Sequence, residues 1–147
     1  MTTAQARTSL RMTRFFKAPR QKVFEAWINP ELLKRWMGPA TVNVVSAQVT
    51  PKVGGSYRIE MYKAAAGTQW IASGTFREIV QNEKLVMTWG WERPDRYETL
   101  LTVLLADKDG GTELTLIHER FANAEDLGGH EHGWIGSLEK LAVVVGG

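Results

Sequence analysis

The stretch HEHGWIGSLEKL, residues 130–141, decides the fold, because it begins a long helix with one apolar face. Trp134, Leu138, Leu141 and Val145 recur at helical spacing and form a single stripe on that helix. A helix of this kind must bury its stripe against another element. The preceding part of the chain therefore has to supply an apolar surface that covers it.

That surface is predicted by a long strand-rich region between residues 41 and 121. Residues 56–62 show the pattern clearly, with Tyr57, Ile59 and Met61 on one face of an alternating run. Turn signals such as Pro94-Asp95 and Gly110-Gly111 separate the runs. We expect about six antiparallel strands here, at residues 42–49, 56–62, 69–80, 84–92, 97–107 and 112–121.

The N-terminal part predicts a further strand and two short helices. Residues 9–16 read as the strand, and Pro19 is well placed in the first turn of the helix that follows. Asn29-Pro30 ends this helix and begins a second one, which Gly38-Pro39 terminates. Residues 1–7 are polar, and we expect them to be flexible.

The start of the C-terminal helix carries two opposing signals. Asn123 is a good N-cap residue, and Glu125 and Asp126 favour the positive end of the helix dipole. Gly128-Gly129 weakens helix continuity, so we expect a break or a kink there.

These elements predict an α+β fold within a single domain that spans residues 1–147. A curved antiparallel sheet of six to seven strands wraps around the long C-terminal helix, and two short helices lie between the first and second strands. This arrangement is the simplest one that buries both the apolar face of the sheet and the stripe of the helix.

Composition excludes several classes of function. The chain has no cysteine, which excludes disulfides, thiolate catalysis and cysteine-bound zinc. The net charge is only +2, and the one basic run, residues 11–22, reads as a solvated face, so we expect no nucleic-acid partner. No apolar run is long enough for a membrane span, and the N-terminal residues lack the apolar segment of a signal peptide. We therefore expect a cytoplasmic protein.

The order of elements and five sequence stretches resemble the START-like superfamily of helix-grip proteins, also called SRPBCC. The chain is most similar to the branch named after the activator of the heat-shock-protein-90 ATPase. The stretches are VFEAWINPELLKRWMGP (residues 23–39), VGGSYRIEM (53–61), GTFREIVQNEKLVMTW (74–89), GGTELTLIHERF (110–121) and HEHGWIGSLEKL (130–141). Each stretch is weak alone, but together they cover nearly the whole chain in the expected order.

This resemblance implies a hydrophobic cavity between the sheet and the C-terminal helix. Members of the superfamily bind lipids, sterols, hormones or polyketides there, and some are cyclases or aromatase-like enzymes. The branch has no shared catalytic triad, metal site or cofactor to carry over, so we assign no catalytic residue, metal or cofactor.

Six tryptophans in 147 residues are the strongest sign of a pocket. Several of them fall on segments that face the space between sheet and helix, where they either fill a core or wall a cavity, and we favour the cavity. The predicted ligand-binding residues are Trp36, Tyr57, Met61, Trp70, Met87, Trp89, Trp91, Leu101, Val103, His118, His130, Trp134, Ser137 and Leu138.

The histidines leave several roles open. His130 and His132 point to different sides of a regular helix, and the HExxH pattern is absent, so we expect no metal site. His118 shares an inward strand face with Leu114 and Leu116. It is a hydrogen-bonded core residue, a polar anchor for a ligand or, less readily, a general base. His130 approaches His118 if the helix covers that end of the strand.

The favoured function is binding of a hydrophobic or aromatic small molecule in the cavity. The first alternative is a cyclase or hydrolase that uses His118 or His130 as an acid or base in the same cavity. The second is a protein that acts on a chaperone ATPase or another macromolecule, which predicts a packed interior and an exposed patch.

Overall fold

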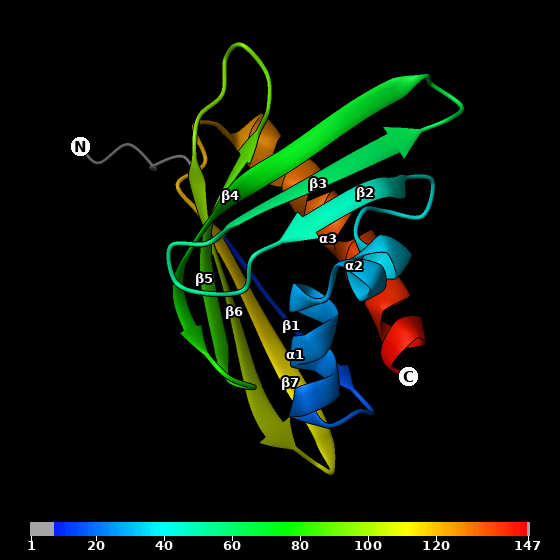
Figure 1. The fold of residues 1–147 in the computed structure, drawn as a ribbon, viewed down its shortest axis with the longest axis vertical. Helices are drawn as coiled ribbons and strands as arrows, with labels where there is room; N and C mark the ends of the chain where they lie inside the picture. The colour runs from blue at the N-terminus through cyan, green and yellow to red at the C-terminus, as the bar shows by residue number, and fades with distance from the viewer. Residues whose placement is uncertain (1–7, 147) are drawn as a thin grey trace, which may run out of the picture.

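The computed structural model describes residues 8–146 and contains one curved antiparallel sheet, two short helices and a long C-terminal helix (Figure 1). The sheet has seven strands in the order β1-β7-β6-β5-β4-β3-β2. The elements are β1 (Leu10–Phe16), α1 (Arg20–Ile28), α2 (Pro30–Trp36), β2 (Asn43–Val49), β3 (Ser56–Lys63), β4 (Thr68–Val80), β5 (Lys84–Trp91), β6 (Thr99–Lys108), β7 (Gly111–Glu119) and α3 (Ala124–Val145). The predicted fold class is confirmed. The flexibility expected of residues 1–7 concerns a segment outside the described residues.

The two short helices lie close to the predicted boundaries, with one difference at Pro19. Pro19 precedes α1 in extended conformation instead of lying in its first turn. Asn29 ends α1 and caps α2, because its side chain accepts a hydrogen bond from the Glu31 amide at 2.9 Å. Pro30 occupies the first turn of α2, where its missing N–H leaves no bond unmade.

The strands bury the faces that their alternation predicts. Tyr57, Ile59 and Met61 are buried on β3, and Leu114, Leu116 and His118 are buried on β7. Cross-strand registers align these inward residues, as in the pairing of Leu101 on β6 with Met87 on one side and His118 on the other. The result is a continuous apolar layer on the face that meets α3.

One position on β4 requires a glycine because two strands are tied across it. The buried Tyr57 hydroxyl of β3 donates a hydrogen bond to the Thr88 carbonyl oxygen of β5. Gly74 is the register partner of Tyr57, and a Cβ at this position would lie 2.0 Å from the same carbonyl oxygen. Only the absence of a side chain at Gly74 allows this close approach.

Helix α3 runs from Ala124 to Val145 without the break expected at Gly128-Gly129. Asn123 caps it as predicted, accepting a hydrogen bond from the Asp126 amide at 2.8 Å. A glycine inside a helix costs only about 1 kcal/mol relative to alanine. The packing of the helix on the sheet outweighs that cost, since the predicted stripe of Trp134, Leu138, Leu141 and Val145 is buried.

Within residues 8–146, no helix combines the length and the apolarity needed to cross a membrane.

Candidate functional site

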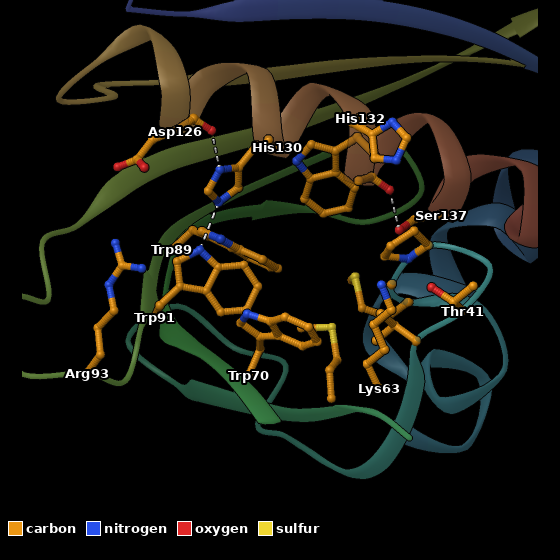
Figure 2. Close-up of a pocket in the computed structure, with 18 of the residues that line it drawn as sticks. Thr41, Lys63, Trp70, Trp89, Trp91, Arg93, Asp126, His130, His132 and Ser137 are labelled. Carbon is orange, nitrogen blue, oxygen red and sulfur yellow. Dashed lines mark hydrogen bonds between the residues drawn. The ribbon is translucent and has the colours of Figure 1, made fainter. Parts of the chain in front are cut away.

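A pocket of about 510 Å³ lies between the sheet and the N-terminal half of α3 (Figure 2). Its floor comes from the ends of β3, β4 and β5, its roof from α3, and one rim from the loop that follows α2. A pocket of this volume is in the range that holds a small organic molecule. Beyond Ser137, α3 does not border the pocket, because Leu138, Leu141 and Val145 are buried in the core.

The middle of the pocket is aromatic. Its walls are Trp70 of β4, Trp89 and Trp91 of β5, and Trp134 of α3. The Trp89 ring centroid lies 5.5 Å from that of Trp91 in an edge-to-face arrangement and 5.3 Å from that of Trp134. Trp70 is 36% exposed, a large apolar surface left facing an open space. Flat apolar walls of this kind suit a flat apolar ligand.

Trp134 is held by a buried chain of hydrogen bonds through His118. The Trp134 indole Nε1 donates to His118 Nδ1 at 3.0 Å. His118 Nε2 lies 2.7 Å from the Thr99 hydroxyl oxygen, which donates in turn to the Trp89 carbonyl oxygen at 2.9 Å. An indole N–H can only donate, so Nδ1 is the acceptor and Nε2 carries the proton. His118 is therefore neutral, with both nitrogens in use.

Trp91 is held by His130 in the same way. The Trp91 indole Nε1 donates to His130 Nε2 at 2.9 Å, and His130 Nδ1 lies 2.7 Å from the Asp126 carbonyl oxygen. His130 therefore carries its proton on Nδ1 and donates it within the first turns of α3. Figure 2 shows this imidazole between the helix above it and Trp91 below it.

The two imidazoles face each other, as expected if α3 covers this end of β7. Their ring centroids are 5.1 Å apart and nearly perpendicular. Burial and the neighbouring His130 lower the pKa of His118 to about 2. Burial also lowers the pKa of His130, opposed by its hydrogen bond to Asp126. Both side chains thus act as neutral acceptors that fix a tryptophan of the pocket.

The two ends of the pocket differ in charge. At the end near His130 lie Arg93, Glu125 and Asp126, so the two carboxylates outnumber the one cation. Arg93 also forms an ion pair with Asp95 at 2.9 Å. At the other end, beside the 37–42 loop, Lys63 is the only charged residue among the described residues of the lining.

The structure divides the fourteen predicted residues into two groups. Those that line the pocket are Met61, Trp70, Trp89, Trp91, His130, Trp134 and Ser137. Those outside the lining, all buried in the core, are Trp36, Tyr57, Met87, Leu101, Val103, His118 and Leu138. Ligand contact by any of the fourteen stays a prediction.

Trp36 and His118 illustrate the second group. The Trp36 indole donates to the Ala26 carbonyl oxygen at 2.9 Å and packs edge-on against Trp27, so Trp36 joins α2 to α1. His118 lies behind Trp134, Trp89 and His130, which separate it from the pocket.

Sequence reasoning missed the charged residues of the lining. Lys63 had a readable signal, since it continues the inward alternation of Tyr57, Ile59 and Met61 by one more step. The loop at Gly38-Pro39, which the sequence suggests as a place of ligand entry, forms part of the rim. Within residues 8–146, no group of three His, Asp or Glu side chains is arranged to hold a metal ion.

Comparison with known proteins agrees with this architecture. The family model described as "Activator of Hsp90 ATPase homolog 1-like protein" matches residues 17–146. A crystal structure from Chromobacterium violaceum is 26% identical, with a TM-score of 0.88 over 94% of this chain and 96% of that chain. A Silicibacter pomeroyi structure that carries the same family name in its title is also 26% identical, with a TM-score of 0.81 over 92% and 95% of the two chains.

A Nitrosomonas europaea structure, 22% identical over 98% of this chain and 97% of that chain with a TM-score of 0.79, shares the fold. The comparison with curated proteins found no match. Because the family model covers most of the chain, this protein belongs to the family of activator of Hsp90 ATPase homolog 1-like proteins, within the START-like superfamily of helix-grip folds.

Proposed function

We propose that this protein binds a flat, largely apolar small molecule in the pocket between the sheet and α3. The observation that carries the proposal is the aromatic middle of the pocket, where Trp70, Trp89, Trp91 and Trp134 surround an open volume of about 510 Å³. Exposed apolar surface is costly in water, and a bound aromatic molecule would remove it from solvent.

The hydrogen bonds behind the walls support a binding role. Two of the tryptophans have their indole N–H groups satisfied by buried or half-buried imidazoles, so their faces are held in place before any ligand arrives. Rigid walls reduce the entropy that is lost on binding. The same bonds disfavour an acid or base role for His118 and His130, because both nitrogens of each ring already have partners.

Blocking the pocket with one side chain tests this function. Gly133 lines the pocket, and a Cβ built on it meets nothing within 4 Å. Gly133→Leu should fill the space between Trp134 and the floor while the helix persists. Gly128→Leu is the matched control, since it adds the same side chain to α3 at a position that also has free space but is outside the lining.

The measurement is native mass spectrometry with a panel of sterols, fatty acids, flavonoids and polyketides, together with fluorescence titration of pyrenebutanol. The original protein and Gly128→Leu should retain a non-covalent adduct, and Gly133→Leu should lose it. The proposal is overturned if the original protein retains no adduct with any panel member and does not bind pyrenebutanol. Unchanged binding by Gly133→Leu would overturn it as well.

A further inference from the structure

The proposed function leaves the polarity of the ligand undefined, and the charges at the two ends of the pocket address it. Lys63 is the last residue of β3, half-buried, and borders the pocket through its long side chain. In Figure 2 this side chain runs from the floor toward α3, at the end marked by Thr41 and Ser137. Across residues 8–146, no described side chain or carbonyl group forms an ion pair or hydrogen bond with the Lys63 ammonium group.

Among the described residues that line the pocket around Lys63, there is no compensating acid. The residues that line this end are Met37, Gly38, Pro39, Thr41, Val42, Met61 and Ser137, all neutral. The pairing of β2 with β3 brings the 37–42 loop close to the end of β3. Val44 pairs with Met61, and Asn43 pairs with Tyr62, the residue before Lys63. A half-buried cation among neutral groups gains from a nearby anion more than an exposed one does.

A second lysine adds positive charge to the same loop from the helix side. Lys140 of α3 donates to the carbonyl oxygens of Pro39 at 3.3 Å and Val42 at 3.1 Å, and burial lowers its pKa. These partners are neutral, so the loop between them carries no acid that offsets either ammonium group. The field at this end of the pocket is therefore positive.

The opposite end of the pocket is much less favourable for a bound anion. Arg93 already pairs with Asp95, and the carboxylates of Glu125 and Asp126 border the pocket there. A ligand anion at that end would lie close to two like charges. The pocket thus has an aromatic middle, one end where carboxylates are in excess and one end with a lysine that has no partner among the described residues.

From this arrangement we infer that the ligand is an aromatic monocarboxylate, whose ring system lies among the tryptophans and whose carboxylate meets Lys63. The one ammonium in the described lining, without a partner in residues 8–146, matches one negative charge, and the Thr41 hydroxyl on the same rim supplies a further hydrogen-bond donor. This inference rests on the proposed function, because it assigns chemistry to a ligand of the same pocket.

The test compares two probes with the same ring system, pyrenebutanoate and pyrenebutanol, by fluorescence anisotropy. The protein should bind the acid more tightly than the alcohol. Lys63→Met keeps the length and most of the apolar volume of the side chain. This variant should weaken the binding of pyrenebutanoate by about tenfold, equivalent to about 1.4 kcal/mol. It should leave the affinity for pyrenebutanol within about twofold of its original value.

Two further variants make the test specific to charge at this position. Lys63→Arg retains the cation and should retain the preference for the acid. Lys52→Met removes an exposed lysine from a turn outside the lining and should leave the affinities for both probes unchanged.

The outcomes separate the two proposals. If the protein binds both probes equally, or if Lys63→Met weakens both alike, the inference of a carboxylate is overturned and the pocket remains a binding site. If the protein binds neither probe, this inference is overturned, and if it also retains no member of the ligand panel, the proposed function is overturned with it.

Discussion

Trp134 of α3 and His118 of β7 are joined by a buried hydrogen bond of 3.0 Å, in which the indole donates to the imidazole. The bond links the helix to the sheet at the point where the core ends and the pocket begins. It places a neutral imidazole directly behind an aromatic wall, so the stability of the fold and the shape of the pocket depend on the same pair.

Replacing His118 with phenylalanine should lower the free energy of unfolding by about 2–4 kcal/mol, because the buried Trp134 N–H and the Thr99 hydroxyl each lose a partner. Urea denaturation followed by tryptophan fluorescence measures the loss. His132→Phe changes an exposed histidine of α3, and its free energy of unfolding should stay within about 0.5 kcal/mol of the original value. Equal losses in the two variants would contradict a structural role for the His118 network.

Stability should fall as pH falls from 7 to 5. In the unfolded chain a histidine titrates near pH 6.5, whereas burial lowers the pKa of His118 in the folded protein to about 2. Below pH 6.5, His118 binds a proton in the unfolded state but stays neutral in the folded state, so a lower pH favours unfolding. The loss from this one group is about 2 kcal/mol at pH 5.

Urea titrations at pH 7 and pH 5 check this dependence. The His118→Phe variant should show a smaller difference between the two pH values, because the group responsible is gone. His130, whose pKa is also lowered by burial, contributes in the same direction and accounts for the remainder. A difference of the same size in both proteins would show that His118 is not responsible.

Substitution of His130 by leucine should affect the ligand more than the fold. The side chain is only partly buried, so the loss of its bond to Trp91 should cost about 1 kcal/mol of stability. Trp91 then loses the contact that fixes its ring, and pyrenebutanol should bind several-fold more weakly. Fluorescence titration alongside urea denaturation separates the two effects, and unchanged affinity would show that Trp91 needs no such support.

The exposed aromatic residues of the β3–β4 hairpin should differ in their effect on binding. Trp70 and Tyr62 are 36% and 39% exposed, but only Trp70 lines the pocket. Trp70→Ala should weaken the binding of pyrenebutanol by about tenfold, since it removes a stacking surface. Tyr62→Ala should leave binding within about twofold, and a similar loss in both would place the probe outside the pocket.

Two glycine substitutions should have opposite effects on stability. Gly128→Ala should raise the free energy of unfolding by about 0.5–1 kcal/mol, because the helix continues through this residue and its Cβ would meet nothing within 4 Å. Gly74→Ala should lower it by about 1–3 kcal/mol, because its Cβ would lie 2.0 Å from the Thr88 carbonyl oxygen. Thermal unfolding measures both, and a stabilised Gly74→Ala would contradict the close approach of β4 and β5.

The architecture was readable from the sequence because it depends on periodic patterns. The alternation of Tyr57, Ile59 and Met61 and the helical spacing of Trp134, Leu138 and Leu141 each specify which face is buried. The interruption expected at Gly128-Gly129 did not occur, since the tertiary packing of α3 outweighs a local propensity.

The site was harder to predict, because residue type alone does not separate a pocket wall from a core. Trp36 and Trp134 are both buried tryptophans, but only Trp134 lines the pocket. The difference is made by tertiary partners, Ala26 in one case and His118 in the other. Lys63 escaped notice because a lysine at the end of a strand ordinarily reads as solvated.

The two ends of helix α3 have different surroundings. Gly129, Gly133 and Ser137 line the pocket, whereas Leu141 and Val145 are buried in the core. This division has an evolutionary consequence. Substitutions in the first turns can alter ligand preference while the last turns preserve the fold, so a lineage can change specificity through single steps that each leave a folded protein. Relatives that share this framework should accordingly diverge in their ligands first at the glycine positions of α3.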